Sequence, residues 1–580
     1  MISSTPWFKR EEITVLLRRV EGFLAGYRQN LALLGPESVG KTTLLKRLLQ
    51  QKSIRSCSLV PLYLEVRESE SVLEWAARFI QALLYGSLQA QQIQPLPMEL
   101  PELLQLGLSH IPRTSMIAKR LLELAEAGKS EEVYDRLWDL PHELAQETGI
   151  PCLLVLDEFH RLRHFSVKDP FVRLGRRIMV QSTTMYLVAS SQLSIARSIL
   201  REGLNLLFGQ FEVIELGPLD PAACRQAIRA VWPNGRVDPS LEHLLMELVQ
   251  GYPGCLDLLL HGLMDRRLPE NDDKERSLLD LLEALLLEPQ GALRVRCEER
   301  LRALPTHRSR RLWIQVLTVV AGGIHRVSPI AAVVHRPFSQ VVSALRALER
   351  AGLVVKQGVF YRISDRLLQV WMHTAYPVLQ GSDLTDPAHT RARFRDAAWA
   401  WITKVYEAVH GPIERQCVAL LRQWDGELVE IDGHRILLPK FERIETVSGP
   451  GSRPVIVARR AAQRSVAGPD GKAWLLIPWA GSMEEVQASA LVQDLQKPPF
   501  KDNRRVVMGA TPVDINARLI FQQARIRFWD LHVLNHLLDL YGLARIPLPE
   551  DVGLQSGETV PIVSGTIPTS PTDLPIERIR

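Results

Sequence analysis

Short apolar runs alternate with amphipathic segments through the first part of the chain. Runs of roughly four to eight apolar residues that end at turn-forming residues are typical of strands buried in a parallel sheet. The predicted strands are residues 31–34, 59–66, 184–190 and 211–216, with another in the run CLLVLDEFHR that begins at residue 152. Helical spacing appears at residues 13–27, 72–84 and 131–147, whereas the Gln- and Pro-rich residues 86–117 predict an irregular surface excursion. This alternation predicts an α/β fold around a parallel sheet for residues 1–217.

A phosphate-binding motif follows the first predicted strand. The residues from Gly35 to Thr42 match the pattern G-x-x-x-x-G-K-[ST], in the strand-loop-helix context that this motif requires. Glycine lets the backbone wrap closely around phosphate oxygens, and the loop N–H groups and the helix N-terminus attract their negative charge. The candidate nucleotide-binding residues are Gly35, Pro36, Glu37, Ser38, Val39, Gly40, Lys41, Thr42 and Thr43. The sequence therefore predicts a P-loop that binds ATP with Mg²⁺.

Single side chains of this motif have separate predicted roles. Lys41 supplies a mobile positive charge to the β- and γ-phosphates and is a candidate catalytic residue. The Thr42 hydroxyl is the expected magnesium ligand, and Thr43 is placed to reach towards the α-phosphate.

Two carboxylates follow the apolar run that begins at Cys152. Asp157 and Glu158 come at the carboxyl end of this predicted strand, where ligands of open α/β sheets bind. In a Walker B site the first carboxylate holds magnesium through water, and the second orients or deprotonates the attacking water. Asp157 is therefore the second candidate metal residue, and Glu158 is a candidate catalytic residue.

The pattern changes twice after the predicted sheet. The sequence Leu219-Asp220-Pro221 marks the start of a helix, and residues 218–290 predict a helical lid. Residues 291–385 predict a winged helix, with helices at 310–321, 329–334 and 338–351 and short strands at 353–356 and 359–363.

The third helix of this segment has one apolar and one polar face. Its expected buried residues are Val341, Val342, Leu345 and Leu348, and its expected exposed residues are Ser339, Gln340, Ser343, Arg346 and Arg350. A polar face with arginines is typical of a helix that reads the DNA major groove. Winged helices also serve as spacers or as docking units. The partner of this segment could therefore be double-stranded DNA, another protein or a second copy of the chain.

The remainder of the chain predicts one more domain and a tail. Residues 386–546 predict an α/β domain that starts with a long helix that includes Glu414. Its predicted strands lie near 427–432, 435–438, 455–459, 472–478 and 504–509, and a further helix is predicted at 483–496. A segment at 526–530 and a last helix close this domain. Residues 547–580 are rich in Pro, Thr, Ser and Gly, which predicts disorder.

Composition limits the class of protein. A chain of 580 residues is expected to form about three to four domains. The net charge of +5 permits nucleic-acid contact without requiring it. The six cysteines are scattered without a C-x-x-C pair, and no long apolar run or signal peptide is apparent. We therefore expect a cytoplasmic protein without a zinc site, a disulfide framework or a membrane span.

Three stretches around the P-loop resemble archaeal-type and STAND-like ATPases of the AAA+ superfamily. They are the Trp-Phe-Lys-Arg-Glu pattern that includes Arg10, the serines at 190–191, and the turn Gly-Tyr-Pro-Gly that includes Pro253. The resemblance implies that Arg10 lies in an element beside the adenine and that Pro253 belongs to a lid that folds over the base. It also implies that Ser191 is a sensor of the γ-phosphate or of the attacking water, and hence a third candidate catalytic residue.

One part of the sequence departs from this family. Its members usually carry an arginine just before the last sheet strand, whereas residues 208–211 read FGQF. The nearest arginines are Arg197 and Arg201, so the source of a trans-acting arginine stays open.

Residues 391–543 resemble the restriction-endonuclease-like domain that is fused to many archaeal ATPases. An active nuclease of this type needs an Asp at one strand end and Glu-x-Lys on the next strand. The expected position of Glu-x-Lys reads Ile477-Pro478-Trp479, and only Asp432 and Glu442 could be remnants of a metal site. We therefore expect an inactive domain that holds DNA or a protein partner.

Four functions are compatible with these features. The first is a switch that binds and hydrolyses ATP and rearranges its winged helix and C-terminal domain. The second is an ATP-regulated DNA-binding protein of the initiator or transposition type. A metal-dependent nuclease and a scaffold that binds ATP without hydrolysing it are the third and fourth.

Overall fold

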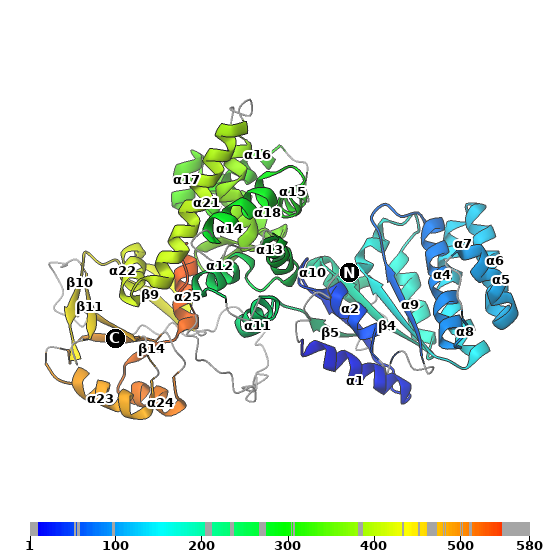
Figure 1. Ribbon diagram of the computed structural model, residues 1–580, viewed down its shortest axis with the longest axis horizontal. Helices are drawn as coiled ribbons and strands as arrows, with labels where there is room; N and C mark the ends of the chain where they lie inside the picture. Colours follow the sequence, from blue (N-terminus) through cyan, green and yellow to red (C-terminus); the bar gives the residue numbers. More distant parts are fainter. Residues whose placement is uncertain are drawn as a thin grey trace. The chain divides into compact units, whose positions relative to one another are not determined.

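The computed structural model describes most of the chain, in two compact units (Figure 1). The described residues are 10–51, 54, 59–94, 99–203, 211–232, 237–265, 274–302, 304–305, 308–380, 387–431, 434–450, 453–460, 473–479, 481, 483–498, 500–501, 503–509 and 513–547. The first unit comprises residues 1–231 with 251–258, and the second comprises residues 232–250 with 259–580. Residues 7–9, 208–210, Asp432 and the predicted tail from 548 onwards lie outside the described residues.

The first unit is built on a five-stranded parallel sheet, as the apolar runs predict. Its strands are β1 (Asn30–Leu34), β2 (Val60–Glu65), β3 (Cys152–Asp157), β4 (Thr184–Ser190) and β5 (Phe211–Glu215). The strand order is β2-β3-β4-β1-β5, and every pairing is parallel. All residues of β1, β3 and β4 are buried. The P-loop strand β1 and the acidic strand β3 are thus separated by β4 alone.

Helices cover both faces of this sheet. The described helices of the first unit are α1 (Glu12–Leu24), α2 (Lys41–Leu49), α4 (Val72–Ala90), α5 (Leu100–His110), α6 (Pro112–Glu126), α7 (Ser130–Leu137), α8 (Leu140–Thr148), η1 (Phe159–His164), α9 (Pro170–Val180), α10 (Leu193–Ser198), η2 (Ile199–Gly203) and α11 (Pro221–Val231). α1 and α2 pack on Leu31 and Leu33, whereas α4 to α9 share a core with Ala32 and Leu34. Successive side chains of a strand point to opposite faces, so the sheet lies between two helical layers.

Two predictions for the segment between β2 and β3 are wrong. The prediction of an irregular excursion over 86–117 is wrong for most of its described residues, because residues 86–90, 100–110 and 112–117 lie in α4, α5 and α6. Pro101 and Pro112 stand in the first turns of α5 and α6, where a missing N–H costs no intrahelical bond, whereas Pro95 and Pro97 lie outside the described residues. The single helix predicted at 131–147 is divided into α7 and α8, and a proline again stands at the start of α8.

The second unit contains the helices and the hairpin predicted for residues 291–385. Its helices before the C-terminal domain are α12 (Pro239–Val249), α14 (Lys274–Leu282), η5 (Glu283–Leu287), α15 (Ala292–Arg302), α16 (Arg310–Ala321), α17 (Val327–Val334), α18 (Phe338–Arg350), α19 (Arg366–Thr374), α20 (Tyr376–Leu379) and α21 (Pro387–His410). α13 (Pro253–Asp265) begins in the first unit and ends in the second. The antiparallel strands β6 (Val354–Gln357) and β7 (Phe360–Ile363) follow α18. Three helices followed by this hairpin occur where the sequence predicts them.

The C-terminal domain is α/β, and two of its elements were not predicted. Its elements are α22 (Ile413–Gln423), β8 (Glu427–Ile431), β9 (His434–Leu438), β10 (Arg443–Ser448), β11 (Pro454–Arg459), β12 (Trp474–Trp479), α23 (Glu485–Leu495), β13 (Arg504–Gly509), α24 (Ile515–Gln523), β14 (Arg527–Trp529) and α25 (Leu531–Leu540). β10 to β14 form one mixed sheet in chain order. β10 and α24 are the unpredicted elements. No helix in the described part of the chain combines the length and apolar character needed to cross a bilayer.

Candidate functional site

The P-loop follows β1 and requires glycine at two places. Gly40 has φ +95° and stands directly before α2. A Cβ atom at Gly35 would lie 2.4 Å from the carbonyl oxygen of Leu216. Ser38 also has a left-handed φ of +61°, within the turn of the loop. Residues other than glycine at positions 35 and 40 would therefore displace the backbone on which a phosphate site depends.

Lys41 folds back over this loop. Its Nζ donates hydrogen bonds to the carbonyl oxygens of Gly35 and Pro36, at 2.8 and 3.0 Å, and lies 3.9 Å from Glu158 Oε1. Burial lowers the pKa of the Lys41 ammonium, and the nearby carboxylates of Glu158 and Asp157 oppose this shift. The ammonium is thus held across the mouth of the loop, beside the acidic strand end.

Thr42 and Asp157, the two predicted metal residues, are in direct contact. The Thr42 hydroxyl donates to Asp157 Oδ2 at 2.6 Å, and the Tyr63 hydroxyl donates to the same oxygen at 2.9 Å. Burial, followed by the Asp157 charge, raises the pKa of Tyr63, which keeps its proton for this bond. A hydroxyl and a carboxylate are hard oxygen ligands of the kind that Mg²⁺ binds beside substrate phosphates. The residues present therefore fit a magnesium ion.

Glu158 is held by groups from the end of β4. The backbone N–H and the hydroxyl of Ser191 donate to Glu158 Oε2 at 2.9 and 2.8 Å. Burial raises the pKa of Glu158, and the Ser191 N–H and Lys41 oppose the rise. Glu158 also has a left-handed φ of +53°, which turns the chain as it leaves β3. The structure thus brings the three candidate catalytic residues together.

His160 joins this cluster, although the sequence did not indicate it. Its Nδ1 lies 2.9 Å from Ser190 Oγ and 3.3 Å from Glu158 Oε2. Burial, together with the charges of Arg161 and Arg163, lowers the pKa of His160 to about 4, so the imidazole is neutral near pH 7. Tyr63 was missed as well. It stands two residues before the end of β2, and it reaches Asp157 because β2 pairs with β3, which no local motif indicates.

The lid turn contacts the P-loop within the first unit. The Gly254 N–H donates to the Ser38 carbonyl at 3.2 Å, and a Cβ at Gly40 would lie 3.4 Å from Pro253 Cγ. Pro253 therefore lies against the loop. Arg10 also lies there, donating to the carbonyl oxygens of Val39 and Gly217 at 2.9 Å each.

The other candidate residues differ in their surroundings. Val39 is fully buried under the loop, whereas Glu37 and Thr43 are exposed. Arg197, one of the two candidate arginines, forms an ion pair with Glu215 at the end of β5. Arg201 is exposed, in η2.

The candidate nuclease residues form no comparable cluster. Residues 477–479 are the buried end of β12, and Glu442 is exposed. Among the described residues, no group of three or more His, Cys, Asp or Glu side chains could hold a metal ion.

Comparisons with known proteins place the P-loop in a family. Residues 25–193 match the family model described as "AAA domain". The search of curated proteins gave no match.

Several solved structures are similar at low identity. A Walker-type ATPase of Pyrococcus abyssi is 18% identical, with 63% of this chain and 96% of that chain covered and a TM-score of 0.43. The ORC2 protein of Aeropyrum pernix, in ADPNP and ADP complexes, is 14% identical, with 69% and 98% covered and a TM-score of 0.42. The ORC1 protein of Aeropyrum pernix, in complex with DNA, is 17% identical, with 64% and 93% covered and a TM-score of 0.33.

The sheet, the loop and the family match define the class of this segment. Because these TM-scores are all below 0.5, the assignment of the fold rests on the parallel sheet and on the family match. Residues 25–193 form an AAA-type P-loop ATPase domain. The chain continues for several hundred residues beyond this match.

Proposed function

We propose that the protein is a molecular switch of the archaeal or STAND-like type that binds and hydrolyses ATP. The observation that carries this proposal is the contact between Thr42 and Asp157, 2.6 Å apart, with Lys41 Nζ 3.9 Å from Glu158. The two segments that must share a magnesium ion therefore meet at one edge of the sheet. Phosphoryl transfer to water needs little beyond positioning and charge neutralisation, and these groups supply both.

Each side chain has a role in this proposal. Lys41 exchanges its bonds to Gly35 and Pro36 for phosphate oxygens, and the loop N–H groups bind beside it. Thr42 and Asp157 hold Mg²⁺, which neutralises phosphate charge when bound. Glu158 accepts a proton from, or orients, the attacking water, and Ser191 fixes the position of its carboxylate.

The lid is the proposed link to the rest of the chain. The turn at Pro253 contacts the P-loop and directly follows α12, which belongs to the second unit. Gln250 and Gly251 join them in successive left-handed conformations, with φ of +44° and +78°. Within the second unit, Glu247 of α12 pairs with Arg366 and with Arg545, at 3.2 and 3.5 Å. A change at the P-loop can therefore reach the winged helix and the C-terminal domain through α12.

The test is ATP turnover by the full chain, with and without double-stranded DNA. We expect slow hydrolysis that needs Mg²⁺ and is lost in Lys41→Ala. Stimulation of turnover by DNA would show that DNA is the partner of the switch. Turnover that does not respond to DNA would indicate a protein partner or self-association instead. Turnover that is equal in wild type and Lys41→Ala would contradict the proposal.

A second candidate is an ATP-regulated DNA-binding protein. It is favoured by α18, on which Ser339, Gln340, Ser343, Arg346 and Arg350 are all exposed while Val341, Leu345 and Leu348 are buried. If Arg346 and Arg350 contact phosphates, replacing each with alanine should weaken DNA binding and reduce the salt slope by about one. Lys119→Ala, which removes an exposed charge from α6, is the control. An unchanged slope in both arginine variants would exclude this role for α18.

A further inference from the structure

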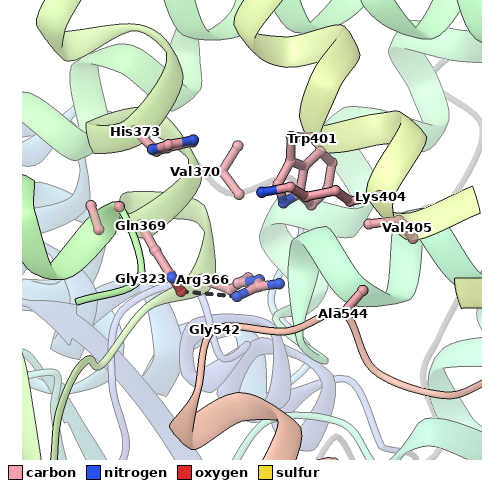
Figure 2. A pocket seen from close by; sticks show the side chains of 12 residues that line it. Gly323, Arg366, Gln369, Val370, His373, Trp401, Lys404, Val405, Gly542 and Ala544 are labelled. Atoms are coloured by element: carbon pink, nitrogen blue, oxygen red, sulfur yellow. Dashed lines mark hydrogen bonds between the residues drawn. The ribbon is translucent and has the colours of Figure 1, made fainter. Parts of the chain in front are cut away.

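A basic pocket lies in the second unit, far along the chain from the P-loop motif. Figure 2 shows it, bounded by α19, by α21, by Ala321 and the two glycines after α16, and by the loop after α25. Its basic lining residues are Arg366 and His373 on α19 and Lys404 on α21. None of the described residues that line it is acidic.

The positive charge in this pocket is only partly balanced. Arg366 pairs with Glu247 and donates to Gln369 Oε1 at 3.0 Å, yet its Nε has no hydrogen-bond partner among the described residues. This nitrogen is itself buried, so it leaves the Arg366 charge incompletely compensated without being open to a ligand, and the charge of Arg366 acts on the pocket through space. Lys404 is exposed and forms no ion pair with a described residue.

The pKa of His373 also indicates an excess of positive charge in the pocket. Burial, followed by repulsion from Lys404 and Arg366, lowers the pKa of His373. A carboxylate facing this ring would have the opposite effect. The pocket is therefore a place where added negative charge would be stabilised.

The size and the donors of the pocket indicate the ligand. Its volume is about 60 Å³, which is enough for a small oxyanion. Arg366, Gln369 and His373 of α19 and Lys404 of α21 line the pocket from different sides (Figure 2). Donors from several directions suit a tetrahedral anion better than a planar carboxylate, and arginine and lysine are the usual phosphate ligands.

We propose that this pocket, formed by Arg366, His373 and Lys404, is a second phosphate-binding site. It takes either free phosphate or one phosphate of a nucleic-acid backbone, since the two present the same oxyanion. The site does not depend on the P-loop or on its proposed function.

The test uses the full chain with Lys41→Ala, which is expected to weaken phosphate binding at the P-loop. Orthophosphate binding is measured by calorimetry, with acetate at equal ionic strength as the comparison, and duplex DNA binding is measured alongside. Lys404→Glu is the main variant, and His373→Gln is a second variant without a change of formal charge near pH 7. The control is Arg393→Glu, an equal charge change at an exposed position of the same helix.

We expect orthophosphate to bind more tightly than acetate and Lys404→Glu to weaken it at least about tenfold, with a smaller loss in His373→Gln. Arg393→Glu should leave it unchanged. If Lys404→Glu lowers DNA affinity as well as orthophosphate affinity, and Arg393→Glu lowers neither, the site binds a phosphate of the nucleic-acid backbone. If Lys404→Glu lowers orthophosphate affinity only, the site binds free phosphate. Equal binding of phosphate and acetate, or equal losses in Lys404→Glu and Arg393→Glu, would overturn the proposal.

Discussion

Lys41 and Glu158 form a charge pair in which neither partner is fully hydrated. Burial lowers the pKa of Lys41 and raises that of Glu158, and each charge opposes the shift of the other across 3.9 Å. Ser191 supplies the hydrogen bonds that an ionised Glu158 needs in this place. The groups expected to act on the γ-phosphate thus also keep one another charged.

Glu158→Gln should separate nucleotide binding from hydrolysis. The amide keeps the shape of the side chain but cannot accept a proton, so we expect ATP affinity to be retained and turnover to fall about a hundredfold or more. Turnover and fluorescent-nucleotide binding measure the two quantities. Glu123→Gln, the same change at an exposed position of α6, should affect neither. If Glu158→Gln leaves turnover unchanged, the result would contradict this role of Glu158 and would support the scaffold hypothesis, in which ATP is bound and not hydrolysed.

Most of the site could be predicted from the sequence, because its motif is local. Gly35, Lys41 and Thr42 lie within one loop, and their spacing alone defines the phosphate site. Tyr63 and His160 could not be predicted in this way. Tyr63 reaches Asp157 only because β2 pairs with β3, and His160 reaches Ser190 only because β4 lies beside β3. Both contacts depend on the strand order.

At the scale of elements, α19 depends on one buried carboxylate. Asp365 Oδ1 accepts the N–H groups of Leu367 and Leu368 and so caps the helix. Its Oδ2 lies 2.8 Å from Arg296 and 2.7 Å from Arg300. Burial by itself would raise the pKa of Asp365, but the two arginines and the helix N–H groups hold it below its usual value. This residue therefore connects α15 to α19.

Asp365→Asn should destabilise the second unit by about 3–5 kcal/mol, because it leaves buried arginine charge unpaired. Because its folded pKa is depressed, ionised Asp365 contributes stability above its unfolded pKa of about 3.9, and this contribution is lost as the pH falls through the folded value. Urea unfolding at pH 7 and at acidic pH measures both effects. The difference between wild type and variant should narrow at the acidic pH.

Asp396→Asn, at an exposed position of α21, is the control for this prediction. Equal stabilities of the Asp365 and Asp396 variants at pH 7 would contradict the role of Asp365.

The mispredicted helix boundaries all involve proline. In α5 and α6 proline stands in the first turn of a helix, where its missing N–H is not needed, and it was interpreted as a break; the division between α7 and α8, where Pro141 again stands in a first turn, was missed. β10 (Arg443–Ser448) has no buried residue, and hence no apolar alternation to reveal it. β1 and β4 were predicted within one residue, and the start of β3 was predicted correctly, because full burial makes these three strands apolar over almost their whole length.

At the scale of the whole molecule, the chain divides into two compact units, and only the first contains the P-loop. Two units with separate cores should unfold in two thermal transitions. ATP with Mg²⁺ binds folded protein only, so at a hundredfold excess over Kd it should stabilise the first unit by about 2.7 kcal/mol. Differential scanning calorimetry should show one transition that moves to higher temperature with ATP. A single transition would contradict this view. So would an ATP-induced shift of only the transition that Asp365→Asn lowers, because Asp365 belongs to the second unit.

The most direct measurement is the affinity of the purified full chain for ATP with Mg²⁺, in wild type and in Lys41→Ala. Since Lys41 is expected to form charged hydrogen bonds to the phosphates, its loss should weaken binding by about tenfold to a hundredfold. Lys119→Ala, which removes an exposed lysine from α6, should bind ATP as the wild type does. If the wild type has no measurable affinity for ATP, or if Lys41→Ala binds it equally well, the triphosphate is not held between the loop and Asp157.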